Sequence, residues 1–197
     1  MEIGILGGSF NPIHLGHLYI AQEVCKKKNL DKVLLVPSKI PPHKDKSDLL
    51  PAPLRLKMVQ RAVEDYPNLE VSPIEINRPG VSYTIDTIRE FQQEFPNDLF
   101  YFIIGSDMLE GLHSWRDIHH LLELCPFLIV HRPDYPIQWN LLNSFSPEEI
   151  KKLQQGIVEI KPVEISSTMV RKAMKEGKDL THLVPPGIIP ILNSLKL

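Results

Sequence analysis

The sequence contains few cysteines, no excess of charge of one sign and no long apolar run. Only two of its 197 residues are cysteines, and these, Cys25 and Cys125, lie far apart, have apolar neighbours and form no CxxC pattern. The absence of such a pattern argues against a disulfide framework or a redox pair. We therefore expect two buried thiols in a reducing compartment.

Charge and hydropathy exclude further classes. The formal net charge of −2 at pH 7 gives no basic excess of the kind that nucleic acids and membranes select. An RNA-binding module in particular would carry a basic surface and bind with steep salt dependence. No apolar run approaches the ~20 residues of a membrane-spanning helix, and no basic-then-apolar leader precedes the first predicted strand. We expect a cytoplasmic protein that binds neither nucleic acid nor membrane.

Several common site motifs are also missing. The glycines near the amino terminus do not form GxGxxG, and no GK[ST] follows them, which argues against the usual dinucleotide fingerprint and a Walker-type loop. His14 and His17 are three residues apart without an intervening glutamate, whereas the zinc protease motif needs a spacing of four. No serine lies in a GxSxG elbow, so no serine nucleophile is evident.

Two kinds of apolar pattern alternate along the chain. Continuous runs such as VLLV, YFII and FLIV are typical of parallel strands that are covered on both faces. The predicted strands are Glu2–Gly7, Lys32–Val36, Leu69–Ile76, Leu99–Ile104, Phe127–His131 and, more weakly, Ile157–Ile160. Between them, stripes at helical spacing predict helices through Leu18, Ala21, Val24 and Cys25, through Leu54, Met58, Ala62 and Val63, and through Ile85, Ile88, Phe91 and Phe95. This alternation predicts an α/β fold with a Rossmann-like open, mainly parallel sheet and helices on both faces.

The length fits one domain, residues 1–197, with a small helical C-terminal section from about residue 147 packed on it. Two helices are predicted there, near Met169–Glu176 with a stop at Gly177, and near Pro186–Leu195. Polar, proline-containing segments at Val36–Pro53 and Asp134–Pro147 are predicted to be loops. The first of these loops follows the second strand, at the end of the sheet where ligands collect.

The segment GGSFNPIHLGH, Gly7 to His17, separates the first predicted strand from the first helix. Asn11 is a good N-cap and Pro12 a good first helical residue, so the helix should begin near His14 with free N–H groups facing the loop. Histidines three apart share one helix face, and the glycine between them leaves room for a ligand to approach. Two imidazoles beside a positive helix end favour an anion site. Local capping by one histidine and solvation of the other is the alternative.

This segment resembles the HxGH signature of the nucleotidyltransferase α/β phosphodiesterase superfamily, in the form found in the bacterial nicotinate-nucleotide adenylyltransferase family. Four further stretches match that family: PPHK ending at Lys44, ExxRxGxSYTxDT from Glu75 to Thr87, GxD at Gly105–Asp107 with Trp115 eight residues later, and ISSTxxR from Ile165 to Arg171. The resemblance covers nearly the whole chain. The family often has aspartate where Asn11 stands, and either residue serves as an N-cap.

The resemblance implies an enzyme that joins ATP and nicotinate mononucleotide to give nicotinate adenine dinucleotide and pyrophosphate in NAD biosynthesis. The acceptor phosphate attacks ATP directly, and Mg²⁺ accompanies the triphosphate. The implied catalytic residues are His17, His14, Lys44 and Arg171. The implied ATP-binding residues are Gly7, Gly8, Ser9, His14, His17, Gly105, Asp107, Ser167, Thr168 and Arg171, and those for nicotinate mononucleotide are Ser9, Phe10, Lys44, Ser82, Tyr83, Thr84, Trp115 and Arg132. No protein residue is expected to ligate a metal.

Many of these residues have an ordinary structural alternative. Ser167 and Thr168 are common helix caps, and Asp107 could cap the short helix that follows it. Trp115 could be a core anchor. The cationic residues, Lys44, Arg132 and Arg171, could be solvated surface side chains, and the adjacent His119 and His120 are predicted to be packing or surface residues rather than a metal pair.

Two elements are expected to distinguish the acid from the amide substrate. The N–H groups around Ser82–Thr84 would accept a carboxylate but would meet the NH₂ donor of an amide badly, and Trp115 would stack on the pyridine ring. The alternatives are the same chemistry on nicotinamide mononucleotide or phosphopantetheine, and a non-catalytic nucleotide-binding regulator. The SYTIDT stretch argues against phosphopantetheine, and the intact His14, His17, Lys44 and Arg171 argue against the regulator. The sequence leaves the oligomeric state open, and a homo-oligomer is compatible with it.

Overall fold

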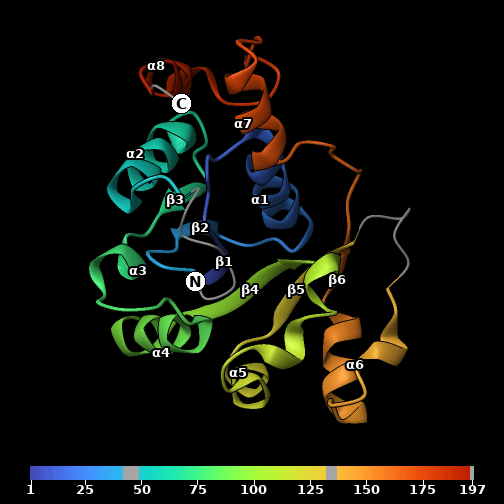
Figure 1. Ribbon diagram of the computed structural model, residues 1–197. Helices are drawn as coiled ribbons and strands as arrows, with labels where there is room; N and C mark the ends of the chain where they lie inside the picture. Colours follow the sequence, from blue (N-terminus) through green and yellow to red (C-terminus); the bar gives the residue numbers. More distant parts are fainter. Residues whose placement is uncertain (42–48, 132–136, 196–197) are drawn as a thin grey trace.

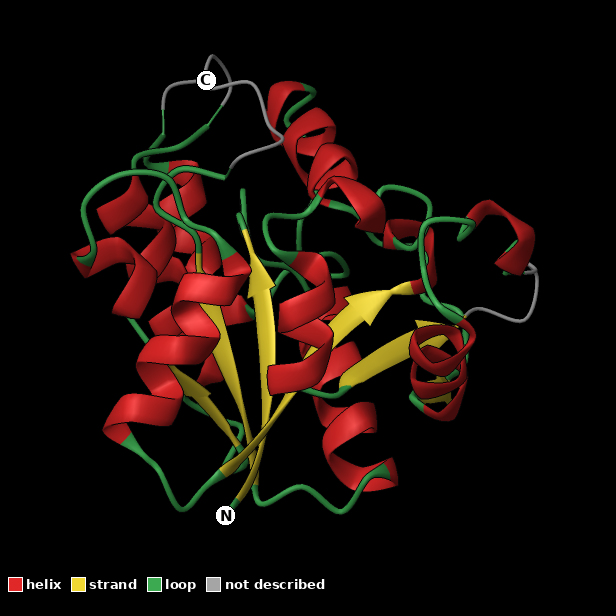
Figure 2. Ribbon diagram, turned by 90° about the horizontal axis from the view of Figure 1, so that it is seen from below, coloured by secondary structure: helices red, strands yellow, loops and turns green. Residues whose placement is uncertain are grey.

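The structure, a computed structural model, describes residues 1–41, 49–131 and 137–195. Within these residues, six strands form one sheet in the order β3-β2-β1-β4-β5-β6. The strands are β1 (Glu2–Gly8), β2 (Lys32–Pro37), β3 (Leu69–Val71), β4 (Leu99–Gly105), β5 (Phe127–His131) and β6 (Ile157–Glu159). Every adjacent pair is parallel, and the strand arrows in Figure 2 run to the same end of the molecule. The Rossmann-like α/β prediction is confirmed, with a sheet that is wholly parallel.

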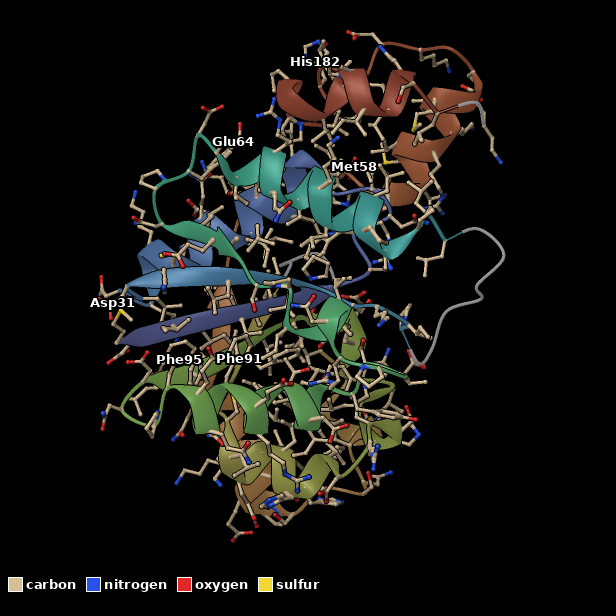
Figure 3. All side chains as sticks on the ribbon, turned by 90° about the vertical axis from the view of Figure 1, so that its left-hand side faces the viewer. Asp31, Met58, Glu64, Phe91, Phe95 and His182 are labelled. Carbon is tan, nitrogen blue, oxygen red and sulfur yellow. The ribbon has the colours of Figure 1, made fainter. Side chains whose placement is uncertain are left out.

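Helices cover both faces of this sheet (Figure 1). On one face lie α1 (Leu15–Lys27), α2 (Ala52–Val63), α7 (Ser167–Lys175) and α8 (Ile189–Asn193); on the other lie α3 (Ile74–Asn77), α4 (Thr84–Glu94), α5 (Ile118–Leu124) and α6 (Pro147–Gln155). Figure 3 shows the sheet edge-on, with Met58 of α2 and Phe91 of α4 on opposite sides. The central strands are buried on both faces, as their continuous apolar runs predict.

The third predicted strand, Leu69–Ile76, is wrong in its second half. The strand ends at Val71, and Ile74–Asn77 forms the short helix α3. Pro73 explains the change, because proline has no N–H to donate to a strand ladder and readily precedes the first turn of a helix. The hydroxyl of Ser72 accepts from the Ile74 N–H at 3.4 Å and supports the turn.

Other boundaries shift by a few residues. Phe95 lies beyond the end of α4 and is exposed, although the helical stripe placed it on the buried face. Helix α7 begins at Ser167 rather than near Met169, and Gly177 follows it with a positive φ of 61°, as a stop signal requires. The last predicted helix is a 3₁₀ turn, η4 (Pro186–Ile188), followed by α8.

The C-terminal part contributes to the sheet as well as to the helical layers. Helix α6 leads directly into the edge strand β6 through Gly156. The backbone carbonyl of Phe127 occupies the space that a Cβ at position 156 would need, so only glycine allows α6 to pack this closely on β5.

Strand order reverses between β1 and β4, which are neighbours in the sheet and carry their connections to opposite faces. In open parallel sheets, ligands bind beyond the carboxyl ends of the strands at such a switch point. The fold therefore points to the ends of β1 and β4 as the site. None of the helices in the described ranges is long and apolar enough to cross a membrane.

Candidate active site

Two adjoining hollows lie beyond the carboxyl ends of β1 and β4. We name them the acceptor hollow and the donor hollow for the roles proposed for them below. The first, the acceptor hollow, has a volume of about 410 Å³ and is bounded by the β1–α1 loop, the start of α4 and the segment after β4. The second, the donor hollow, has a volume of about 580 Å³ and extends towards β5 and residues 137–141. Both hollows share Gly7, His17 and Asp107 as lining residues. His17 therefore contributes to the boundary between the two hollows, together with Ile103, Ile104 and Met108.

The two histidines of the β1–α1 loop stack on each other. Their ring centroids are 3.6 Å apart, and the edge of Phe10 meets His17 at a centroid distance of 5.0 Å. His14 is the N-cap residue of α1, and its backbone N–H donates to Nδ1 of His17 at 3.2 Å. A ring nitrogen that accepts a hydrogen bond carries no proton, so this contact selects the neutral tautomer of His17 with the proton on Nε2.

His14 is only 6% exposed and lies beneath His17, outside the lining of either hollow. Burial lowers the pKa of His14 to about 4, so its ring is neutral at pH 7. Gly16 allows this packing: a Cβ there would lie 3.0 Å from Nδ1 of His14 and 3.3 Å from the carbonyl oxygen of Ile165. The prediction that a ligand approaches the backbone at Gly16 is wrong, because atoms of His14 and Ile165 fill this space.

The low pKa of His14 makes stability depend on pH. The unfolded chain binds a proton near pH 6.5 and the folded protein binds it only near pH 4, so the free energy of unfolding falls as pH decreases through that window. We expect wild type to lose about 2 kcal/mol more than a His14→Gln variant between pH 7 and pH 5. Urea unfolding at both pH values measures this difference. Equal losses in the two proteins would contradict the buried, neutral His14.

Asn11 and the start of α7 hold the β1–α1 loop from the other side. The prediction that Asn11 caps α1 is wrong, because the chain turns at residues 11–12 and the helix begins four residues after Asn11. Its side-chain oxygen accepts instead from the Leu50 N–H at 2.9 Å, a contact that aspartate could also make. Arg171 donates from Nη1 to the Asn11 carbonyl at 2.8 Å, and the Ser167 hydroxyl donates to the Pro12 carbonyl at 2.9 Å.

Ser166 is the N-cap of helix α7, so the alternative in which Ser167 or Thr168 caps this helix is wrong. The Ser166 hydroxyl accepts from the Met169 N–H at 3.2 Å, so Ser167 and Thr168 form the first turn of the helix. Ser167 lines the acceptor hollow. Thr168 accepts from Nη2 of Arg171 at 3.2 Å, and neither of these two residues lines a hollow.

The opposite wall of the acceptor hollow is the start of α4. Ser82, Tyr83 and Thr84 all line it. The Ser82 N–H donates to the Ile40 carbonyl at 3.1 Å, so the N–H groups of Tyr83 and Thr84 are the ones left to face a ligand. Trp115 lines the same hollow, and its ring meets Phe102 edge-on at 5.9 Å. One face of the indole can therefore be anchored in the core while the other meets a ligand.

A polar network supports this wall, and one of its members, the buried Glu75, also lines the acceptor hollow. The Thr87 hydroxyl donates to the Glu75 carboxyl at 2.7 Å and accepts from Arg78 at 2.8 Å, and Arg78 also pairs with Glu90 at 2.7 Å. Burial raises the pKa of Glu75, and hydrogen bonds from Thr87 and Ser82 partly oppose the rise. The network gives the conspicuous ExxRxGxSYTxDT stretch a physical purpose, because it fixes the position of the first turn of α4.

Asp107 lines the donor hollow and lies within a 3₁₀ turn, η1 (Ser106–Met108). The N-cap of this turn is Gly105, so the alternative in which Asp107 caps the turn is wrong. The Asp107 carboxylate folds over Gly105 and occupies the place of a Cβ there. Asp107 is thus held at the junction of the two hollows.

The structure brings most of the predicted site residues together. Those that line a hollow are Gly7, Gly8, Ser9, Phe10, His17, Ser82, Tyr83, Thr84, Gly105, Asp107, Trp115 and Ser167. Lys44 and Arg132 lie outside the described residues, so their placement stays a prediction. His119 bonds Glu149 at 2.7 Å and His120 bonds Glu123 at 3.2 Å, both exposed as expected.

Two arginines near the site were missed. Arg116 lines the acceptor hollow and stacks on the Tyr83 ring at 4.7 Å, and nothing in the sequence beyond its place after Trp115 indicates this. Arg55 of α2 is 0% exposed. The sequence does contain a signal for the burial of Arg55. Arg55 lies three residues before Met58 and seven before Ala62, which places a charged residue on the apolar face of the helix, where charged residues are rare.

The chain belongs to the cytidylyltransferase-like family, whose model matches residues 5–173. It is 38% identical over 196 residues to the "Probable nicotinate-nucleotide adenylyltransferase" of Oceanobacillus iheyensis, covering 100% of this chain and 96% of that protein. The corresponding protein of Lactococcus lactis is 37% identical over 202 residues, covering 100% and 94%. Within the family, the chain therefore belongs with the nicotinate-nucleotide adenylyltransferases.

A solved structure confirms the fold. The nicotinic acid mononucleotide adenylyltransferase of Plasmodium falciparum, complexed with NaAD, superimposes with a TM-score of 0.75. The match covers 96% of this chain and 95% of that chain at 22% identity.

Proposed function

We propose that this protein transfers the adenylyl group of ATP to nicotinate mononucleotide, giving nicotinate adenine dinucleotide and pyrophosphate. The observation that carries the proposal is the pair of hollows that meet at His17 and Asp107. A dinucleotide has two bases and two riboses joined through phosphates, and the joined hollows provide two compartments with a histidine at the junction. The full-length relatives named for this activity support the same conclusion.

The acceptor hollow suits nicotinate mononucleotide. The N–H groups of Tyr83 and Thr84 at the start of α4 favour a carboxylate, and the helix dipole adds to this preference. Arg116, over the Tyr83 ring, adds a positive charge near the same place. Trp115 provides an aromatic face for the pyridine ring. The amide of nicotinamide mononucleotide would present N–H donors to these donors and bind less well.

In the reaction we propose, an oxygen of the acceptor phosphate attacks the α-phosphorus of ATP. The bond from that phosphorus to the bridging oxygen of the β-phosphate breaks, and pyrophosphate leaves with the electron pair. Nε2–H of His17 donates to an α-phosphate oxygen as negative charge develops on it. His14 supports His17 by stacking beneath it, and its own contact with a phosphate stays a prediction. No enzyme nucleophile takes part.

The start of α7 completes the phosphate site in this proposal. The first turn of the helix, with Ser167, offers N–H groups to the β- and γ-phosphates, and Arg171 adds charge from one turn further on. Lys44 would contribute a second cation. Mg²⁺ would enter bound to ATP and neutralise the leaving pyrophosphate. Among the described residues there is no group of three or more His, Cys, Asp or Glu side chains that could hold a metal ion.

We further propose a cytoplasmic enzyme of NAD biosynthesis, because both cysteines are free and buried. In this proposal residues 1–197 form one domain.

The proposal predicts a strong acceptor preference. Pyrophosphate release should be measured with ATP and Mg²⁺ and with nicotinate mononucleotide, nicotinamide mononucleotide or phosphopantetheine offered separately. We expect kcat/KM for the nicotinate compound to exceed that for the amide by roughly 10²-fold or more, because unpaired donors at the site penalise the amide. Release with another acceptor alone would overturn the substrate assignment, and no release with any acceptor would favour a nucleotide-binding regulator.

A further inference from the structure

Arg55 is a fully buried cation that does not itself line either hollow. It lies in the first half of α2, and its side chain is 0% exposed. Within the described residues its guanidinium donates four hydrogen bonds, all to backbone carbonyls: from Nη1 to Ser9 and Ser38, both at 2.7 Å, from Nη2 to Lys39 at 3.1 Å and from Nε to Leu50 at 2.8 Å. Such a set of contacts holds backbone rather than side chains in place.

These carbonyls belong to the two loops that border the acceptor hollow. Ser9 is in the β1–α1 loop, next to Phe10, and Ser38 follows β2; all three line the hollow. Nη1 of Arg55 bridges the two loops by donating to one carbonyl from each. The Ser38 N–H and hydroxyl also join the loops, donating to the Gly8 carbonyl at 2.9 and 3.3 Å, and Arg55 fixes their spacing one residue further along, at Ser9.

Further hydrogen bonds join the second loop to the start of α4, the wall proposed above to bind the carboxylate, which we call the carboxylate-reading wall. The Lys39 N–H donates to the Ser82 hydroxyl at 3.1 Å, and the Ser82 N–H donates to the Ile40 carbonyl at 3.1 Å. Lys39 also donates from Nζ to the Arg78 carbonyl at 3.1 Å. Arg55 thus holds the segment to which the start of α4 is attached.

The charge of Arg55 is compensated by dipoles. Among the ion pairs of the described residues, none includes Arg55. Burial lowers the pKa of its guanidinium, but arginine stays charged in proteins. The planar fork can satisfy four carbonyls at fixed directions, whereas the point charge of a lysine cannot.

We propose that Arg55 is a positioning residue that sets the distance between the histidine loop and the carboxylate-reading turn at the start of α4, and so determines acceptor affinity and selectivity. This inference rests on the proposed function. Arg55 acts through Ser9, Lys39 and Ser82, and contacts no substrate itself.

The test compares Arg55→Lys and Arg55→Met with the control Arg61→Met. Arg61 lies on the same helix, is exposed and pairs only with Glu64 within the described residues. For each protein, KM is measured for nicotinate mononucleotide and for ATP, together with kcat/KM on nicotinate and nicotinamide mononucleotide. KM does not depend on how much of a preparation is folded, so simple destabilisation lowers apparent kcat and leaves KM and the acceptor ratio unchanged.

We expect both Arg55 variants to raise KM for nicotinate mononucleotide by about tenfold and to reduce the preference for acid over amide by a similar factor, since small displacements of positioning groups are costly. KM for ATP should change less, and Arg61→Met should match wild type. Wild-type KM and preference in Arg55→Lys would overturn the inference, as would failure of that variant to fold, because Arg55 would then be a folding residue. If wild type itself does not act on nicotinate mononucleotide, the proposed function fails first.

Discussion

Replacement of His17 by alanine is expected to leave a folded protein that loses roughly 10²-fold or more in kcat, the scale for removing one hydrogen-bond donor to a transition state. His17 is one of the residues that line both hollows, and the His14 N–H on its Nδ1 leaves Nε2–H as the donor. Because the interaction strengthens only as charge develops, kcat and kcat/KM should fall together. Steady-state kinetics on purified protein measures both.

Two further variants make this result specific. His17→Gln retains a neutral N–H donor and should lose less than the alanine variant. His120→Ala removes an exposed histidine of α5, which bonds only Glu123 in the described part of the chain, and should behave as wild type. Wild-type kcat in His17→Ala would remove this residue from the mechanism.

The second large effect is expected at Arg171. Arg171→Ala should lower kcat/KM for ATP by about 10²-fold, because it removes a charged fork from the proposed phosphate site and also releases the Asn11 carbonyl of the histidine loop. Arg171→Lys should fall between wild type and the alanine variant, since lysine keeps the charge but not the bidentate geometry. Titrating ATP at saturating acceptor gives these values.

The control for Arg171 is its neighbour. Lys172 is on the same helix and is exposed, with Glu176 at 4.0 Å. Lys172→Ala removes the same charge from α7 without touching the loop, so it should leave kcat/KM for ATP unchanged. If it reduces kcat/KM as much as Arg171→Ala does, the helix contributes only a diffuse field and Arg171 has no directed role.

The sequence predicts the fold well because its signals are strong and local. Continuous apolar runs indicate parallel strands buried on both faces, and β1, β2, β4 and β5 occur within one residue of prediction. The errors occur where local and tertiary signals compete. Leu69–Ile76 alternates apolar and polar residues on both sides of Pro73, as a strand would, but the proline ends the strand. Phe95 continues the stripe of α4, but the helix stops one residue before it.

Site residues are predictable from the sequence where one local turn of the backbone places them. They are not predictable where segments that are distant in the sequence come into contact. The loop Gly7–His17 places its residues by local geometry, and Gly7, Gly8, Ser9, Phe10 and His17 line a hollow. The cap of α1 was assigned to Asn11, whose side chain instead binds Leu50, 39 residues away. Arg55 joins backbone from two loops, and such long-range hydrogen bonds leave no local pattern beyond a charge on an apolar helix face.

The most direct test of the account is a crystal structure with nicotinate adenine dinucleotide bound. The account predicts that the pyridine carboxylate accepts hydrogen bonds from the N–H groups of Tyr83 or Thr84, that the phosphates lie against His17, and that the adenosine half occupies the donor hollow. A nicotinate ring in the donor hollow, or phosphates away from His17, would contradict both the substrate assignment of the two hollows and the role of the histidine between them.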